Sequence, residues 1–297
     1  MENIVYFAPA KINFSLSIGK KGAFNLHPIR SLMRKINVTD KITFNLTDGR
    51  YKIKSTAGAN LKNKISESDL QSISNEDNIV IKAAKTFFDS LNIKNQGIDI
   101  FIEKNIPLNA GLGGGSSDGA GLLLKLNEIY NNAIDEDGLR KIALKIGSDA
   151  PFFLTEDDAV VSGFGENLEK INRGTLQKYY IVLVIPDFGI STKEAYADYD
   201  DFMLTNNINY CNIQCLDFKE LEFKNDFENV IFKRHPVIKD IKESMLLNGA
   251  DVSLLSGSGS AVFGAFATER SAKDYIDKIK SFNFCEKVRM NYLAETL

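Results

Sequence analysis

The chain has few residues of the kinds that bind metal ions or form disulfides. It contains two histidines, His27 and His235, and three cysteines, Cys211, Cys215 and Cys285. A zinc site with four Cys or His ligands would need almost all of them together, and the Cys211–Cys215 spacing has no second pair. We therefore expect no structural metal, and we interpret the odd number of cysteines as reduced thiols of a cytoplasmic protein.

The chain also lacks an excess of charge of either sign and any long apolar run. Its 39 acidic and 36 basic residues give a net charge of -3, whereas a protein that coats nucleic acid needs a basic excess. No stretch approaches the roughly 18 apolar residues of a membrane span, and the first residues do not resemble a signal peptide. With 297 residues the chain can form one large or two modest domains without a disulfide or metal. We predict a cytoplasmic protein with no nucleic-acid or membrane partner.

Apolar periodicity predicts a mixture of strands and helices. Strands are expected at 4–18, 41–46, 98–102, 159–162, 180–185, 252–255, 261–266 and 286–292, and helices at 75–91, 117–130, 136–146, 237–247 and 270–281. Asn75 or Asp77 is expected to cap the first helix, Asp48-Gly49 is typical of a hairpin, and residues 54–75 are expected to form a surface loop. Consecutive strands in the N-terminal half favour an α+β fold, with a domain boundary in 155–175 that we place between 1–165 and 166–297.

The strongest motif is a glycine-rich segment from Pro107 to Asp118, between a predicted strand and a predicted helix. Four glycines in five positions let consecutive N–H groups point at one anion, and the following helix adds the positive end of its dipole. Ser116 and Ser117 supply hydroxyls suited to phosphate oxygens or to the water shell of a cation. The segment has neither a Walker A nor a Rossmann spacing. It predicts a phosphate site, and the alternative is a flexible turn with serine capping.

Three further segments are ambiguous when taken alone. Lys11 stands in an apolar strand, where a buried lysine is costly unless a negative group meets it, and the alternative is that it points to solvent. Asp149 lies in a tight turn after a helix, where it could also form an Asx turn or a cap. The Ser/Gly loop 256–260 joins two predicted strands and could pack against the phosphate site.

Taken together and in order, these segments resemble the three motifs of the GHMP small-molecule kinase superfamily. The motifs are Pro-Ala-Lys-Ile-Asn at 9–13, Gly-Leu-Gly-Gly-Gly-Ser-Ser at 111–117 and Ser-Gly-Ser-Gly-Ser at 256–260. Smaller matches around 27–33, 77–79, 147–153, 163–166, 190–196 and 225–228 favour the branch that acts on a diphosphocytidyl sugar alcohol of the non-mevalonate isoprenoid pathway. The resemblance implies an N-terminal domain like ribosomal protein S5 domain 2, a ferredoxin-like C-terminal domain, and ATP and acceptor meeting between them.

The resemblance also implies roles for individual residues in phosphoryl transfer. Asp149 would be the catalytic base, and Lys11 would keep it ionised and orient the acceptor hydroxyl. The resemblance implies Mg²⁺ together with ATP but does not identify protein ligands for the metal. Asn78 would lie near the adenine. The residues expected to bind ATP are Asn78, Pro107, Asn109, Ala110, Gly111, Leu112, Gly113, Gly114, Gly115, Ser116 and Ser117.

On the acceptor side, the resemblance implies that His27 recognises the cytosine and that Tyr196 stacks on it. Leu26 stands where the family has a second stacking tyrosine, and Phe24 is the nearby aromatic residue. The expected substrate-binding residues are Asn13, Leu26, His27, Phe164, Thr192, Tyr196, Ser256, Gly257, Ser258 and Gly259. The alternatives are a GHMP kinase for homoserine or a mevalonate-type alcohol, and a nucleotide-binding regulator without catalysis. A monomer or a homodimer is expected.

Overall fold

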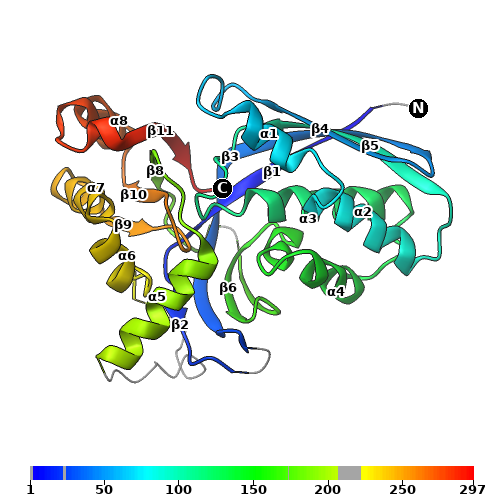
Figure 1. The fold of residues 1–297 in the computed structure, drawn as a ribbon, viewed down its shortest axis with the longest axis horizontal. Coiled ribbons are helices and arrows are strands. Elements are labelled where there is room, and N and C mark those ends of the chain that lie inside the picture. The colour runs from blue at the N-terminus through cyan, green and yellow to red at the C-terminus, as the bar shows by residue number, and fades with distance from the viewer. Residues whose placement is uncertain (1–2, 23–24, 173, 207–221) are drawn as a thin grey trace. The chain divides into compact units, whose positions relative to one another are not determined.

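The computed structural model describes residues 3–22, 25–172, 174–206 and 222–297 (Figure 1). The chain forms two compact units, each of which is described by itself. Unit 1 consists of Met1–Ala10, Val38–Pro107 and Gly113–Glu156, and unit 2 of Lys11–Asn37, Leu108–Leu112 and Asp157–Leu297. Each unit therefore combines segments that are distant in the sequence, and the boundary at 165/166 stays a prediction.

Unit 1 contains a short sheet and a group of helices. β5 (Gln96–Lys104) lies between β4 (Tyr51–Ala57), to which it is parallel, and the second part of β3 (Ile29–Asp48), to which it is antiparallel. α2 (Ile79–Ser90), α3 (Gly114–Ile129) and α4 (Glu136–Ile146) pack on one another, and the 3₁₀ helix η2 (Ala150–Leu154) packs against α3 and α4. The apolar stripe of α2 is buried, as its spacing predicts. α1 (Glu67–Ile73) lies against β4.

Unit 2 contains strands from both ends of the chain. The first part of β3 pairs with β2 (Ser17–Ile18) and β6 (Asp158–Gly163), and β6 pairs with β7 (Asn167–Ile171). β1 (Ile4–Asn13) begins in unit 1 and ends in unit 2. A separate antiparallel sheet has the order β11 (Val288–Glu295), β8 (Tyr180–Pro186), β10 (Val262–Phe266) and β9 (Val252–Leu255).

Helices cover the four-stranded sheet of unit 2 (Figure 1). α7 (Pro236–Leu247) packs on β9 and β10, and α8 (Glu269–Lys278) packs on β8, β10 and β11. α5 (Thr192–Thr205) contacts α6 (Glu228–Arg234), which contacts α7. The 3₁₀ helices η5 (Ile279–Ser281) and η6 (Cys285–Lys287) precede β11. The central strand β8 is buried from Ile181 to Ile185, which explains its uninterrupted apolar run.

The α+β fold class is confirmed, as are most of the expected elements. The hairpin prediction at Asp48-Gly49 is wrong, because β5 inserts between the two strands that this turn joins. Turn residues specify a change of direction but not which strands pair. The surface-loop prediction for 54–75 is wrong at both ends, since β4 continues to Ala57 and α1 begins after a Ser66–Asp69 capping box. α1 buries no residue, so it shows no apolar period.

Two further differences concern polar residues. The first half of β3 was not predicted because Arg34 and Lys35 interrupt its apolar pattern, yet both are buried. Arg34 Nε lies 2.8 Å from Asp158 Oδ2, and Lys35 Nζ donates to the Asp157 carbonyl at 2.9 Å. The predicted caps of α2 are also wrong. The N-cap is Asn78, whose side-chain oxygen accepts from the Val80 N–H.

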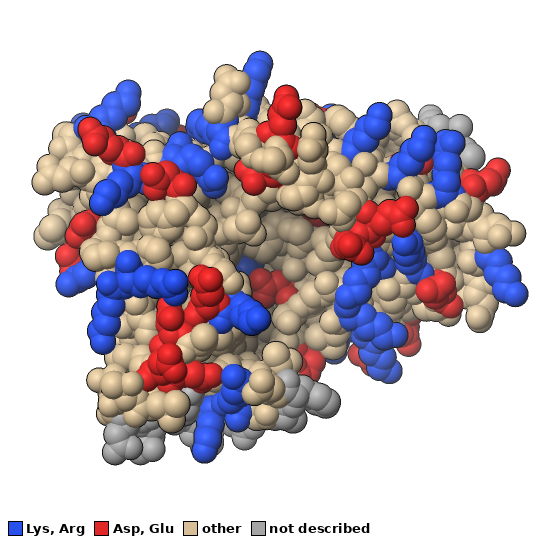
Figure 2. Space-filling model, viewed as in Figure 1, with Lys and Arg blue, Asp and Glu red and all other residues tan. Residues whose placement is uncertain are grey.

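The charge distribution agrees with the balanced composition. On the face shown in Figure 2, acidic and basic side chains are interspersed. Among the described residues, no helix is long and apolar enough to cross a membrane. Cys285 is a free thiol, whereas Cys211 and Cys215 lie outside the described residues.

Candidate active site

The glycine-rich segment forms the start of α3, but the helix begins earlier than predicted. Its first residue is Gly114 rather than Ser117, and its N-cap is Gly113, which has a φ of 69°. Glycine has a low helix propensity, but this turn is closely packed, since a Cβ added to Gly114 would lie only 3.0 Å from the Ile106 side chain. We infer that this packing keeps the turn helical. No side chain caps the helix. Its first N–H groups therefore remain available to an anion, as the motif predicts.

The turn that carries Asp149 packs beside this helix start, within unit 1. A Cβ on Gly147 would lie 3.0 Å from Ser116 Oγ, so the two segments are in close contact. Asp149 precedes η2 and is half-buried, and its side chain does not cap that helix. The capping alternative is therefore not adopted. Ser117 is buried, and its hydroxyl has no hydrogen-bond partner among the described residues, which fits a ligand group at this position.

Three charged side chains lie buried behind the first turns of α3. Lys104, at the end of β5, donates to Asp40 on β3 and to Asp118 Oδ2 at 2.9 Å. Asp40 Oδ1 also accepts the backbone N–H groups of residues 105 and 106, at 2.6 and 2.9 Å. Tyr6 donates to the Asp118 carbonyl at 2.6 Å. We call Asp40, Lys104 and Asp118 the buried triad.

The triad carries two carboxylates for one lysine, which shifts its proton equilibria. Burial, reinforced by Asp40 and opposed by Lys104, raises the pKa of Asp118 to about 8. Burial alone would lower the pKa of Lys104, but Asp118 and Asp40 outweigh it and raise that pKa to about 12. Lys104 therefore stays charged. A Cβ on Gly114 would lie 3.4 Å from Lys104 Nζ, so this charge lies next to the start of α3.

Lys11 and Asn13 lie at the end of β1, in unit 2. Lys11 is 3% exposed, so the alternative that it points to solvent is wrong. Its Nζ donates to Asn13 Oδ1 at 2.6 Å, and Asn13 Nδ2 donates to Ser31 Oγ at 2.7 Å. Ser31 Oγ donates in turn to the Ser15 carbonyl at 2.6 Å. This chain of hydrogen bonds fixes the ammonium group of Lys11.

The Ser/Gly loop and residues 110–112, which belong to the glycine-rich segment, contact each other within unit 2. Ser256 Oγ donates to the Gly111 carbonyl at 2.9 Å, and the N–H of Ala261 donates to the Ala110 carbonyl at 3.2 Å. Gly111 has a φ of 73°, and a Cβ there would lie 2.0 Å from the Ser256 carbonyl oxygen. Only glycine permits this approach. A Cβ on Gly257 would lie 3.5 Å from Lys11 Nζ.

Two residues that sequence reasoning did not place in the site hold the Ser/Gly loop. Asn225 is buried, and its Nδ2 donates to the carbonyls of Leu255 and Gly257, both at 2.8 Å. Glu228 Oε1 accepts the Leu255 N–H at 2.9 Å. In the sequence, residues 225–228 were recognised only as one of the smaller family matches, and α6 begins at the last of them, Glu228. The sequence feature that could have indicated that Asn225 and Glu228 hold the loop is their position beside the buried Phe227.

The expected acceptor residues His27 and Tyr196 lie together in unit 2. Their rings are stacked, with centroids 5.1 Å apart and planes at 10°. His27 is 7% exposed, so it is not a surface histidine. Thr192, at the start of α5, lies with its hydroxyl 2.9 Å from that of Ser258, which links this helix to the Ser/Gly loop.

Other predicted residues lie in turns. Leu26 is 53% exposed, and Phe24 lies outside the described residues. Phe164 is in the turn after β6, where its N–H donates to Glu166 Oε2 at 2.5 Å. Asn109 has a φ of 53°. Asn78, expected near adenine, caps α2, and its Nδ2 donates to the Ile73 carbonyl at 2.6 Å.

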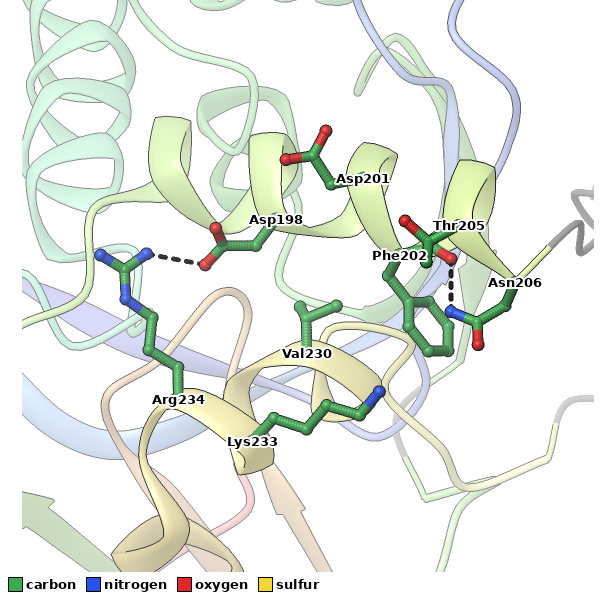
Figure 3. Close-up of a pocket in the computed structure, with 8 residues that line it drawn as sticks. All are labelled: Asp198, Asp201, Phe202, Thr205, Asn206, Val230, Lys233 and Arg234. Atoms are coloured by element: carbon green, nitrogen blue, oxygen red, sulfur yellow. Dashed lines mark hydrogen bonds and ion pairs between the residues drawn. The ribbon is translucent and has the colours of Figure 1, made fainter.

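A separate open groove lies between α5 and α6 (Figure 3). The described residues that line this groove include no predicted site residue. Across the groove, Arg234 Nη1 donates to Asp198 Oδ2 at 2.7 Å (Figure 3). Within the described part of the chain, no cluster of three or more His, Cys, Asp or Glu side chains could hold a metal ion.

Comparison with known proteins places the chain in a family. The model of the GHMP kinases N terminal domain matches residues 78–163, and that of the GHMP kinases C terminal domain matches residues 212–284. A 4-diphosphocytidyl-2-C-methyl-D-erythritol kinase of Clostridium novyi (strain NT) is 38% identical over 282 residues, which cover 92% of this chain and 95% of that protein. The chain belongs to the GHMP kinases. It is a small-molecule phosphotransferase that uses ATP.

Solved structures agree on the fold. A crystal structure of 4-(cytidine 5'-diphospho)-2C-methyl-D-erythritol kinase matches with a TM-score of 0.73 and 24% identity, covering 98% of both chains. A homoserine kinase from Cytophaga hutchinsonii matches with a TM-score of 0.68 and 18% identity, covering 100% of this chain and 95% of that one. Because kinases with different acceptors share the fold, the fold alone does not identify the acceptor.

Proposed function

We propose that this protein transfers the γ-phosphoryl group of ATP to the 2-hydroxyl of 4-diphosphocytidyl-2-C-methyl-D-erythritol. The observation that carries the acceptor is the stacked pair of buried His27 and half-buried Tyr196 in unit 2, since such rings suit recognition of a base. Homoserine and mevalonate have no base for this pair to bind. The name of the Clostridium novyi relative supports the same acceptor. We further propose a cytoplasmic monomer or homodimer.

The glycine-rich segment would bind the triphosphate of ATP. The uncapped start of α3 presents backbone N–H groups to the phosphates, and the unpartnered Ser117 hydroxyl suits a phosphate oxygen or the water shell of a cation. Mg²⁺, when bound with ATP, would neutralise part of the phosphate charge. Asn78 would contribute near the adenine through the turn that it caps.

The chemical step needs a base, an oriented hydroxyl and stabilisation of charge. The acceptor oxygen forms a bond to the γ-phosphorus as the bond to the β-phosphate oxygen breaks, and ADP leaves. Asp149 takes the proton of the hydroxyl. Lys11, fixed by Asn13, orients that hydroxyl, and Asn13 contacts the substrate beside it. The presence of both Lys11 and Asp149 in the sequence argues against a regulator without catalysis.

Release of ADP from the purified enzyme tests the acceptor directly. A coupled assay compares the diphosphocytidyl substrate with homoserine and mevalonate at equal ATP. We expect turnover with the first alone. Turnover with homoserine or mevalonate only would overturn the proposal in favour of another acceptor, and ATP binding without turnover on any alcohol would favour a regulator.

The role of Asp149 is tested by Asp149→Asn, which keeps the size of the side chain but removes the base. We expect kcat to fall by about 10²- to 10⁴-fold, with ATP affinity largely unchanged in a calorimetric titration. Asp137→Asn, an exposed carboxylate in the first turn of α4, is the matched control and should keep full activity. Near-normal turnover of Asp149→Asn would exclude Asp149 as the base.

A further inference from the structure

The buried triad carries three titratable side chains that the proposed mechanism does not use. Each of these side chains is at most 3% exposed. Well-packed apolar side chains of similar volume often give a protein the same stability as buried ion pairs, or more. Stability alone therefore does not account for Asp40, Lys104 and Asp118, and the groups that they hold point to a second role.

The triad holds both ends of the glycine-rich segment, and these ends lie within unit 1. At the entry, Asp40 Oδ1 accepts the backbone N–H groups of the two residues that precede the segment, at 2.6 and 2.9 Å. At the exit, Lys104 Nζ donates to Asp118 Oδ2 at 2.9 Å, in the first turns of α3. Because Lys104 also donates to Asp40, one ammonium group joins the entry to the exit.

The first turn of α3 is held by further contacts and carries the groups proposed to bind phosphate. The Tyr6 hydroxyl donates to the Asp118 carbonyl at 2.6 Å, and a Cβ on Gly114 would lie 3.4 Å from Lys104 Nζ. The N–H groups of this turn are uncapped, and the buried Ser117 hydroxyl has no hydrogen-bond partner among the described residues. A movement of the turn would therefore displace these groups.

We propose that Lys104 and Asp118 are positioning residues of the nucleotide site, whose mutual hydrogen bond holds the first turn of α3 where it meets the phosphates of ATP. This inference rests on the proposed function, in which the glycine-rich segment binds the triphosphate. Neither residue touches a reacting atom. Both act through the turn that they hold.

The triad acts through geometry rather than through net charge. Burial, reinforced by Asp40, raises the pKa of Asp118 to about 8, so at pH 7 this carboxyl is largely neutral and the charges of Lys104 and Asp40 cancel. A neutral cluster attracts a triphosphate only weakly. A fixed turn, in contrast, favours binding, because the apparent dissociation constant rises when the binding-competent arrangement is populated only part of the time.

Two neutral variants of Asp118 separate the hydrogen bond from the charge. Asp118→Asn keeps an oxygen that can accept from Lys104, whereas Asp118→Leu has a similar shape and no acceptor. In both variants Lys104 keeps its ion pair with Asp40, so no buried charge is left without compensation. We expect Asp118→Leu to weaken ADP binding about 10- to 100-fold in a calorimetric titration and to raise KM for ATP, with KM for the acceptor unchanged.

The conservative variant should rescue the site. Asp118→Asn is expected to bind ADP as tightly as the wild type, because the bond from Lys104 is retained. Wild-type ADP affinity in Asp118→Leu would overturn the inference. An equal loss of affinity in Asp118→Asn and Asp118→Leu would also overturn it, since the charge and not the hydrogen bond would then be what matters.

A second comparison separates positioning from a general loss of stability. Lys104→Met removes the donor, and Arg34→Met breaks another buried ion pair of β3, to Asp158 at 2.8 Å. Urea unfolding should show that both variants are destabilised, but only Lys104→Met should weaken ADP binding. If both variants lose ADP affinity to the same degree, or neither does, the positioning role is overturned. If Lys104→Met does not fold, the two Asp118 variants decide.

The two proposals fail in distinguishable ways. If the wild type does not phosphorylate the diphosphocytidyl acceptor, the proposed function fails, whatever the titrations with ADP show. If the wild type does so, and Asp118→Leu binds ADP as tightly as the wild type, the positioning role of Lys104 and Asp118 alone is overturned.

Discussion

Two loops of this kinase are anchored by different chemistry. In unit 1, three buried charges lie behind the start of α3, where Lys104 bonds to Asp40 and Asp118. In unit 2, most of the hydrogen bonds described for the Ser/Gly loop come from neutral side chains. Asn225 donates to the carbonyls of Leu255 and Gly257, and Ser256 donates to the Gly111 carbonyl. Both anchors satisfy buried polar atoms, but they respond differently to mutation and to pH.

The difference follows from what each anchor leaves behind when one member is lost. Removal of a neutral partner leaves an unsatisfied polar atom, which costs about 1–3 kcal/mol. Removal of one charge from a buried cluster leaves the opposite charge without compensation, which costs about 3–5 kcal/mol. The charged anchor can also gain or lose protons. The start of α3 should therefore be the more fragile and the more pH-dependent of the two.

The largest effect is expected from Lys104→Met, which removes the only cation of the triad. Because the pKa of Asp118 is raised to about 8, this carboxyl is largely protonated at pH 7, and the loss of Lys104 leaves the buried Asp40 carboxylate without a counter-charge. We therefore expect the free energy of unfolding to fall by about 3–5 kcal/mol. Urea unfolding at pH 7 measures this change. Lys41→Met is the matched control, because Lys41 also pairs across β3 and β5, with Glu103 at 2.7 Å, but its side chain is 40% exposed. Its loss should cost less than about 1 kcal/mol.

A neutral triple variant sharpens the first prediction. Asp40→Asn and Asp118→Asn, added to Lys104→Met, remove the uncompensated charges and should recover part of the lost stability. If Lys104→Met and Lys41→Met destabilise equally, the buried triad has no special cost and the comparison of the two anchors fails.

A smaller effect is expected from Asn225→Ala in the neutral anchor. The carbonyls of Leu255 and Gly257 lose their donor, and the Phe227 N–H loses its acceptor at 3.0 Å. We expect a loss of about 2–3 kcal/mol in the free energy of unfolding. Asn229→Ala removes an exposed amide that makes one bond, to the Asp226 carbonyl at 3.0 Å, and should cost under 1 kcal/mol. A larger loss for Asn225→Ala than for Lys104→Met would reverse the ranking.

The sequence predicted the two glycine-containing loops better than the buried charges behind the start of α3. The glycine-rich segment and the Ser/Gly loop were found because their composition is unusual, and Gly111 requires a positive φ and a close approach to Ser256. Lys104 and Asp40 were not found, because a charged residue usually faces solvent. Their burial depends on partners far apart in the sequence, which periodicity does not report.

The same limit explains the missed elements. Arg34 of β3 is buried against Asp158 of β6, which is distant in the sequence, and the order β4-β5-β3 depends on a strand that follows later in the chain. Helix α3 starts at Gly114 because packing overrides glycine propensity. Local signals therefore fixed the classes of element and the motifs, whereas long-range ion pairs and packing decided register and boundaries.

The smallest of the predicted effects concerns pH and the charged anchor alone. Because the pKa of Asp118 is raised from 3.8 to about 8, the folded protein binds more protons than the unfolded chain between these values. Its contribution to stability is therefore complete below about pH 4 and decreases as the pH rises towards 8. One proton corresponds to about 1.4 kcal/mol per pH unit at most, so between pH 6 and 8 we expect a loss of about 2 kcal/mol. In Asp118→Asn this pH dependence of the free energy of unfolding should vanish, whereas Asp137→Asn, which changes an exposed carboxylate on α4, should keep it.

Urea unfolding at pH 6, 7 and 8 measures how steeply the free energy of unfolding falls with pH in each protein. An equally steep fall in the wild type and in Asp118→Asn would show that the Asp118 carboxyl is ionised throughout this range.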